Sequence, residues 1–339
     1  MARQVRRVGA YGVLRDGEQR VLLVRGSERD DFPGVWSLPG GGLEHAEHPA
    51  DAVVREVAEE TGLAVELTGL RAVVADVVPY PDLGVALHTD RVLFEVAAVG
   101  GALRAERHGS TDLARWSTLA EAAGLPLLAF TAEALGLPVV PLPSGALRRR
   151  TPFGQPGTDR RQRFGAYGLV TDPAGRVLLS LIAEGYPGAG RWHLPGGGTD
   201  HGEQPVTALL RELVEESGQL GRVIDLIGVD NLHNPAALGP EGRPLDWHGI
   251  RVVYRVAVDV PTEPEVTELA GGSTARASWF TPVELRELPL TEIAAATLQV
   301  PARSAGSGST GARSPVGGAL LRYSRGGADG ETGDDARDG

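Results

Sequence analysis

Cysteine and lysine are both absent from the 339 residues of this chain. Without cysteine there is no disulfide framework, thiolate zinc site, iron–sulfur cluster or cysteine nucleophile. Without lysine there is no Schiff base and no P-loop lysine. No apolar run approaches the roughly 20 residues of a membrane span, and residues 1–14 lack the apolar region and cleavage site of a signal peptide. We therefore expect a cytoplasmic protein with no membrane partner.

What the chain does contain predicts two folded domains. Hydrophobic residues make up 42% of the sequence, which excludes a wholly disordered or coiled-coil protein. At roughly 100–200 residues per domain, the length suggests two domains. Most of the net charge of −11 comes from two short segments, residues 41–63 and 197–219. A merely solvated acidic surface would spread its charge more evenly, and the overall acidity argues against a nucleic-acid partner.

The sequence repeats itself at an offset of 156 residues. The strings GAYG, RVLL and LPGGG each occur in both halves, and residues 9–62 match residues 165–218 at 26 of 54 positions. A period of this length corresponds to a domain rather than to a solenoid unit, so the chain is a tandem duplication. We expect an N-terminal domain over residues 1–138 and a C-terminal domain over residues 163–300.

Two low-complexity segments flank the second copy. Residues 139–162 are rich in proline, glycine and arginine, and a solvated linker is favoured over a basic arm that attracts phosphate. Residues 301–339 contain almost no core-forming side chains, which predicts a disordered tail.

Each copy is expected to contain strands, a helix, further strands and closing helices. In the first copy a helix should begin at Pro49 and stop at Gly62, since proline suits a first helical turn and glycine suits a C-terminus. Further short helices are predicted over residues 118–124 and 128–136. The corresponding helices of the second copy are predicted over residues 205–217, 281–288 and 291–299.

The first helix carries three glutamates, Glu56, Glu59 and Glu60, at positions i, i+3 and i+4. This spacing places all three carboxylates in one arc of the helix surface, where they repel one another. A hard divalent cation removes the conflict, and a set of oxygen ligands selects Mg²⁺ or Mn²⁺ over zinc. One triplet alone could equally be an exposed acidic face. The second copy repeats the triplet as Glu212, Glu215 and Glu216.

A glycine-rich loop precedes each of these helices. Consecutive glycines, including Gly41 and Gly197, let the backbone approach a metal or phosphate closely. Glu47 and Arg55 bracket the first loop and helix, and their spacing allows an ion pair that holds the two together. The glycine loop, the ion pair and the carboxylates together predict a site that holds a cation against a pyrophosphate.

These residues resemble the Nudix box, G-x5-E-x7-R-E-U-x-E-E-x-G-U, in which U is apolar. The first copy matches it fully, from Gly41 to Leu63, and the second departs from it only at Gln219, in the final apolar position. That departure affects packing rather than charge. The box positions of the two copies are Gly41, Glu47, Arg55, Glu56, Glu59, Glu60 and Gly62, and then Gly197, Glu203, Arg211, Glu212, Glu215, Glu216 and Gly218.

The resemblance implies an α/β (α+β) fold with two tandem Nudix α/β/α sandwiches around mixed sheets. Similar enzymes use Mg²⁺ to hydrolyse a nucleoside diphosphate linked to another moiety, through in-line attack of activated water. By this likeness the six glutamates of the two triplets bind metal and act in catalysis, assisted by the backbone of Gly41 and Gly197. The remaining box residues, Glu47, Arg55, Gly62, Glu203, Arg211 and Gly218, are structural.

The identity of the general base stays open. Glu56 and Glu212 are candidates, and some relatives use an acidic residue beyond the box. The candidates beyond the box are Glu106 and Asp112 in the first copy, and Glu265 and Glu268 in the second. Trp36, Trp192, His88 and His248 are expected to be structural residues.

The leading hypothesis is a hydrolase with two competent sites for a small nucleotide, such as a nucleotide sugar, an ADP-ribose-like compound or a nucleoside triphosphate. An alternative is a sensor that binds such a metabolite without turnover, and an RNA 5′-pyrophosphohydrolase is a weaker one. The two copies could pack as a monomeric pseudo-dimer, or the chain could form a homodimer.

Overall fold

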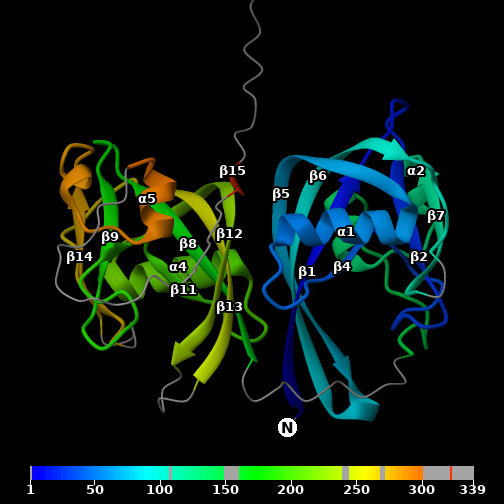
Figure 1. The fold of residues 1–339 in the computed structure, drawn as a ribbon, viewed down its shortest axis with the longest axis horizontal. Coiled ribbons are helices and arrows are strands. Elements are labelled where there is room, and N and C mark those ends of the chain that lie inside the picture. Colours follow the sequence, from blue (N-terminus) through cyan, green and yellow to red (C-terminus); the bar gives the residue numbers. More distant parts are fainter. Residues whose placement is uncertain are drawn as a thin grey trace, which may run out of the picture.

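In the computed structural model the two halves of the chain form two similar lobes (Figure 1). The structure describes residues 2–106, 109–148, 160–238, 244–267, 272–300 and 321–322. The first lobe contains the elements from β1 to α3, and the second contains those from β8 to α5. No helix in these ranges combines the length and the apolar character needed to cross a bilayer.

The first domain contains two small sheets. In one, with strand order β4-β1-β6-β5, β1 is parallel to β6 and the other pairings are antiparallel. The other has the order β3-β2-β7 and is antiparallel. The strands are β1 (Arg3–Leu14), β2 (Val21–Gly26), β3 (Trp36–Ser37), β4 (Gly40–Gly42), β5 (Leu63–Tyr80), β6 (Val85–Gly101) and β7 (Thr111–Ser117).

Helices cover both faces of the first sheet of this domain. Successive side chains of β1 point to opposite faces, so each face contributes to a separate buried cluster. Val8 and Leu14 share a buried cluster with Val53 of α1 (Pro49–Thr61). Tyr11 lies in a second cluster with Phe130 of α3 (Ala129–Leu135), 4.7 Å from it between ring centroids. The predicted α/β/α sandwich with a mixed sheet is confirmed. A short helix, α2 (Leu119–Ala123), and a 3-10 turn, η1 (Pro81–Leu83), complete the domain.

The second domain repeats this plan, with the parallel pair β8–β13 at its centre. Its strands join in one sheet because β8 also pairs with β9. The strands are β8 (Arg160–Thr171), β9 (Val177–Ile182), β10 (Trp192–His193), β11 (Gly196–Gly198), β12 (Arg222–Leu238), β13 (Pro244–Ala257) and β14 (Thr274–Phe280). The helices are α4 (Pro205–Ser217), the 3-10 turn η3 (Glu284–Glu287) and α5 (Glu292–Leu298).

The helix boundaries follow the predicted signals. Pro49 is the first residue of α1, His48 accepts a hydrogen bond from the Ala50 N–H, and Gly62 ends the helix with a φ of 73°. Thr118 and Glu121 form a reciprocal capping box at the start of α2. Within the predicted segment 281–288, the helical residues are the 3-10 turn Glu284–Glu287.

The two domains pack against each other through equivalent loops. One hydrophobic cluster includes residues of both domains, and β5 contacts β12 and α4. The Gly202 N–H donates to Nδ1 of His88 over 2.9 Å, and the Ala46 N–H donates to Nδ1 of His248 over 3.3 Å. Both histidines are fully buried, so each serves a structural role at the domain interface. A single chain thus contains a pseudo-two-fold pair of domains.

The linker lies partly, and the tail almost wholly, outside the described residues. Residues 139–148 contain no helix or strand, residues 149–159 are outside the described ranges, and β8 begins at Arg160. Of the expected disordered tail, the structure describes Leu321–Arg322 alone, which form a short strand, β15, paired with β12. The linker and tail boundaries therefore stay predictions.

Candidate functional site

The first carboxylate triplet lies where α1 faces the glycine-rich β4. Glu60 is buried, with 4% of its surface exposed, and its Oε2 accepts a hydrogen bond from the Gly40 N–H over 2.9 Å. Gly41 lies directly against Glu56, because a Cβ at Gly41 would come within 2.5 Å of the Glu56 carboxylate. The close approach predicted for the glycine loop is therefore toward the helix carboxylates, and a side chain at Gly41 would displace Glu56.

The second domain builds the same contact. Glu216 is 5% exposed and accepts from the Gly196 N–H over 3.0 Å. A Cβ at Gly197 would lie 2.6 Å from the Glu212 carboxylate. In both domains the structure brings the predicted glycines and glutamates together.

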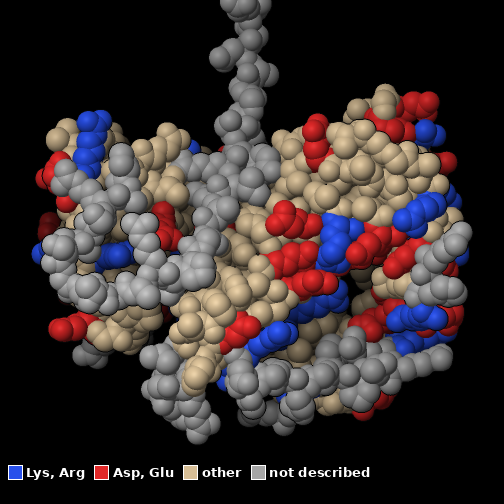
Figure 2. Space-filling view, in the orientation of Figure 1, with Lys and Arg blue, Asp and Glu red and all other residues tan. Residues whose placement is uncertain are grey.

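Arg55 ties the loop to the helix. Its guanidinium donates to both carboxylate oxygens of Glu47, over 2.8 and 2.9 Å, and to the carbonyl oxygen of Gly42. The same group also donates to Glu56 over 2.9 Å and to Glu59 over 3.4 Å. Figure 2 shows acidic side chains beside arginine over this face of the first domain. The second domain repeats each of these bonds with Arg211, Glu203, Gly198, Glu212 and Glu215.

Burial raises the pKa of the innermost carboxyls. The pKa of Glu60 lies well above its usual range because the group is desolvated, and the pKa of Glu216 is raised to about 7 for the same reason. Desolvation also raises the pKa of Glu56 and Glu212, although the adjacent arginine opposes the shift. Carboxyls held this close and out of water favour either a proton or a cation. An all-oxygen donor set of this kind fits Mg²⁺ or Mn²⁺.

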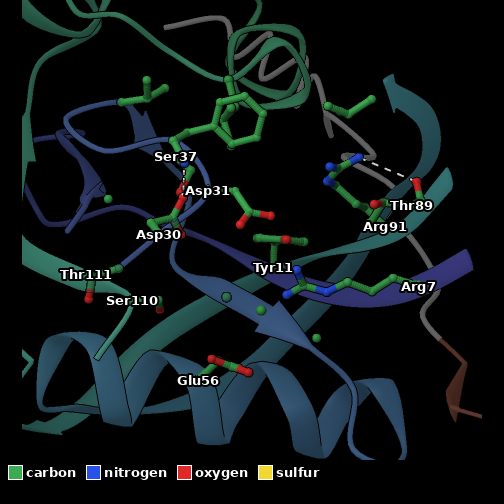
Figure 3. Close-up of a pocket in the computed structure, with 18 of the residues that line it drawn as sticks. Arg7, Tyr11, Asp30, Asp31, Ser37, Glu56, Thr89, Arg91, Ser110 and Thr111 are labelled. Carbon is green, nitrogen blue, oxygen red and sulfur yellow. Dashed lines mark hydrogen bonds between the residues drawn. The ribbon is translucent and has the colours of Figure 1, made fainter. Parts of the chain in front are cut away.

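A cavity of about 300 Å³ opens beside the first triplet and is lined by Glu56 and Glu60. Glu56 lies on its α1 side, and Arg7, Tyr11 and Arg91 lie across from it (Figure 3). Asp30 also lines this cavity, so its lining carries charges of both signs. Such a lining suits an anionic ligand that binds together with a metal cation.

The second domain has a cavity of about 320 Å³ at the equivalent place. Arg163 and Arg251 line it, together with the aromatic rings of Tyr186 and Trp247. His193 also lines this cavity, and burial lowers its pKa to about 3, so its imidazole is neutral at physiological pH. The second cavity thus combines fixed positive charge with aromatic surface.

Several cavity residues lie outside the box and were not predicted as site residues. Arg7, Tyr11 and Arg91 line the first cavity. Their counterparts, Arg163, Tyr167 and Arg251, line the second. These residues occur at equivalent positions in both copies, and this repetition could have identified them from the sequence. Repetition alone, however, does not distinguish a site residue from a structural residue.

The acidic residues downstream of the box differ in position. Glu106 accepts from the N–H and hydroxyl of Thr111, each over 3.1 Å, and its charge contributes to the raised pKa of Glu60. Asp112 instead forms an ion pair with Arg25. Of the candidates in the second copy, the Glu265 N–H donates to the carbonyl of Ser217, and Glu268 lies outside the described residues. Of the downstream candidates, Glu106 is therefore the one whose charge influences the pKa of a triplet glutamate, Glu60.

The remaining predicted features are structural. Trp36 and Trp192 are buried in the cores of their domains. Gln219, the departure from the box, is also buried, and its amide exchanges hydrogen bonds with the backbone and hydroxyl of Thr262. The departure therefore replaces apolar packing with hydrogen bonds that hold a neighbouring loop.

Both halves of the chain match the same protein family. The NUDIX domain profile matches residues 5–136 and 161–300. An ADP-ribose pyrophosphatase of Methanocaldococcus jannaschii is 32% identical over 126 residues, covering 37% of this chain and 68% of that protein. An RNA pyrophosphohydrolase of Roseobacter denitrificans is 38% identical over 68 residues, covering 20% of this chain and 41% of that protein. A crystal structure of a MutT NUDIX hydrolase from Burkholderia pseudomallei has 30% identity and a TM-score of 0.34, covering 39% of this chain and 96% of that one.

Proposed function

Because this chain belongs to the Nudix hydrolase family, we propose that both of its domains hydrolyse the pyrophosphate bond of a small nucleotide. The observation that carries the proposal is the double occurrence of the complete triplet, each beside a cavity of about 300 Å³. A domain that had become a scaffold or a sensor would have no need to keep three mutually repelling carboxylates.

The metal would be held by the six glutamates of the two triplets, with the backbone of Gly41 and Gly197 beside them. When bound, Mg²⁺ supplies positive charge that neutralises phosphate oxygens and favours ionisation of the attacking water. Mn²⁺ has the same preference for oxygen ligands. Arg55 and Arg211 hold the glutamate-bearing helix and the glycine loop in fixed positions relative to each other.

The residues of the chain have separate tasks in this hydrolysis. Arg7 and Arg163 line the cavities with fixed positive charge and bind phosphate oxygens of the substrate. Glu56 and Glu212 take the proton of water as its oxygen attacks phosphorus and the bridging P–O bond breaks. Glu106 is the alternative base in the first domain, since its charge acts on Glu60.

The substrate class that we favour is a nucleoside diphosphate joined to another group, as in ADP-ribose or a nucleotide sugar. The relative from Methanocaldococcus jannaschii is named an ADP-ribose pyrophosphatase, and the aromatic rings of Tyr186 and Trp247 offer stacking surfaces in the second cavity. Nucleoside triphosphates are the second class. A cytoplasmic location and the absence of a nucleic-acid partner stay predictions from composition.

Product analysis with Mg²⁺ tests the proposal. The purified chain is offered ADP-ribose, nucleotide sugars, diadenosine polyphosphates, NADH and nucleoside triphosphates. We expect cleavage of one class into two phosphorylated products, and no turnover by the double variant Glu60→Gln/Glu216→Gln with an unchanged fold. Full Mg²⁺-dependent turnover by that variant would refute the site, and tight binding without turnover by the natural chain would favour a sensor.

A further inference from the structure

Three side chains with metal-binding chemistry meet at the domain interface, away from the carboxylate triplets. His45 comes from the loop between β4 and α1 of the first domain, His233 from β12 and Asp246 from β13 of the second. Asp246 Oδ1 lies 3.0 Å from Nε2 of His45 and 2.8 Å from Nε2 of His233. All three potential ligand atoms lie within 4.8 Å of one another.

The contact that His45 makes with Asp246 differs from the contact that His233 makes with it. The buried Nε2 of His45 lies 3.0 Å from the Asp246 oxygen, but this contact does not have the geometry of a hydrogen bond. His233 does form a hydrogen bond to the same oxygen. A buried ring nitrogen without a hydrogen bond is uncommon in native proteins and calls for an explanation such as a bound ion.

The loop that carries His45 is held in place by the second domain. The Ala46 N–H donates to Nδ1 of His248 over 3.3 Å, and Nδ2 of Asn231 donates to the Ala46 carbonyl over 3.1 Å. Nε2 of His248 is 2.6 Å from Oδ1 of Asn231, so both nitrogens of this buried ring are occupied. His248 is therefore a positioning residue and not a ligand, and it fixes the backbone next to His45.

We propose that His45, His233 and Asp246 bind a divalent transition metal of the Zn²⁺ class that joins the two domains. Two imidazole nitrogens and one carboxylate oxygen form a common zinc ligand set, which leaves a fourth position for water. In a tetrahedral site with such ligands the donor atoms lie about 3.3 Å apart. The two distances to Asp246 are close to this value, and the ligand atoms of the two histidines lie within 4.8 Å of each other, so binding requires the side chains to adjust around the ion. The other oxygen, Oδ2, is 3.6 Å from the Arg160 guanidinium.

The pseudo-two-fold partner of this cluster provides an internal control. His201 corresponds to His45, and it occupies the equivalent loop of the second domain. Val77 corresponds to His233, because these residues pair with His88 and His248 respectively. Ala86 corresponds to Asp246, and its carbonyl lies 3.1 Å from Nε2 of His201. The equivalent place therefore lacks two of the three ligands and should not bind the metal.

The test is a titration of the full chain with Zn²⁺ in competition with a chromophoric chelator. Excess Mg²⁺ keeps the box carboxylates occupied. We expect one tight Zn²⁺ equivalent per chain, bound with an affinity that falls about 100-fold or more in His45→Ala, since loss of outer-shell partners alone costs 10- to 100-fold. The matched variant His201→Ala should bind as the natural chain does. Thermal unfolding should shift upward with Zn²⁺ in the natural chain and in His201→Ala, but not in His45→Ala.

His233→Gln and Asp246→Asn keep side-chain size and serve as second variants if His45→Ala does not fold. Both should lose tight Zn²⁺ binding while the circular dichroism spectrum stays unchanged. The proposal is overturned if the natural chain binds no tight Zn²⁺, or if the ligand variants bind as tightly as His201→Ala. It is also overturned if Glu56→Gln/Glu212→Gln abolishes the binding, because the ion would then sit at the boxes. Zinc affinity is measured without substrate, so this result is independent of the proposed hydrolysis.

Discussion

Glu60 and Glu216 occupy equivalent positions and are almost equally buried, but they receive different hydrogen bonds. Glu216 accepts from the Gly196 N–H, from the Ser180 hydroxyl over 3.0 Å and from the Thr274 hydroxyl over 2.5 Å. Within the described residues, Glu60 accepts from the Gly40 N–H alone. Two copies of one motif therefore place the same carboxyl in two different electrostatic environments.

The difference comes from strands outside the box. Val24 occupies the position equivalent to Ser180 in the repeat. Thr111, the counterpart of Thr274, directs its hydroxyl to Glu106 instead of Glu60. Hydrogen bonds to a carboxylate favour its charged form. Glu216 is accordingly held nearer to ionisation, with a pKa of about 7, and Glu60 more firmly as a neutral acid before metal binding.

A second difference concerns the middle carboxylate of each triplet. The Glu59 side chain is 53% exposed, whereas that of Glu215 is 16% exposed. The Thr267 N–H donates to the backbone carbonyl of Glu215, so a loop of the second domain lies over this end of α4. Gln219 anchors the same loop at Thr262. The middle carboxylate is therefore more enclosed in the second triplet than in the first.

The largest effect should come from inactivating one site at a time. Glu60→Gln and Glu216→Gln each remove a charge from one triplet while keeping its shape. Turnover by the affected domain should fall by about 1,000-fold or more, as expected when metal-dependent charge stabilisation is lost. Steady-state kinetics on each substrate would then assign activity to a domain. Equal residual activity in both single variants on every substrate would mean that the two sites are redundant.

The same substitutions, which lower turnover, should raise the stability of the metal-free protein. Folding raises the pKa of both carboxyls, so stability falls as pH rises from about 4.5 toward the folded pKa, and the full penalty is present above it. Glu216→Gln should therefore stabilise the chain at pH 8 by up to about 3 kcal/mol, given its pKa of about 7. Glu60→Gln should stabilise it more.

Urea unfolding with a chelator at pH 8 and at pH 4.5 would measure this effect. The differences should shrink to about 0.4 kcal/mol at the lower pH, where both carboxyls are protonated in the folded state and about half protonated in the unfolded state. Glu66→Gln, at an exposed position, is the control. A greater gain for Glu216→Gln than for Glu60→Gln would contradict the comparison of their hydrogen bonds.

The interface histidine His248 should make the domain contact sensitive to acid. Burial, and then the charges of His45 and His233, lower the pKa of His248 to about 4. Below about pH 6.5 the imidazole is protonated in the unfolded chain but stays neutral in the folded protein, so the free energy of unfolding decreases as pH falls. Between pH 6 and pH 4.5 this loss should be about 2 kcal/mol. His248→Gln should reduce the slope of stability against pH in this window, and an unchanged slope would show that the ring titrates normally.

The smallest expected effect comes from exchanging the hydrogen-bond donors. Ser180→Ala removes one donor to Glu216, and Val24→Ser offers one to Glu60. Since one such bond contributes about 1 kcal/mol, the pKa of Glu216 should rise and that of Glu60 should fall by up to about one pH unit. NMR titration of the metal-free carboxyl carbons would report both values. Shifts in the same direction in both domains would rule out the donors as the cause.

Local sequence signals predicted the long helix of each domain and the position of the carboxylate triplet on it. The spacing of Glu56, Glu59 and Glu60 places them on one helical arc whatever the rest of the fold does. Pro49 and Gly62 bound their helix for equally local reasons, and the repeat showed that the same device occurs twice. Such features depend on residues a few positions apart, so the chain itself encodes them directly.

Tertiary structure decided what distinguishes the two copies. Ser180 and Thr274 lie 36 and 58 residues from Glu216, and only the pairing of β9 with β14 brings their hydroxyls to it. His45 meets His233 and Asp246 because two domains dock with their loops exchanged across a pseudo-two-fold axis. Strand register and domain docking set these contacts through many weak interactions distributed over the chain. Sequence spacing therefore determined where each carboxylate triplet lies, and packing alone determined its surroundings.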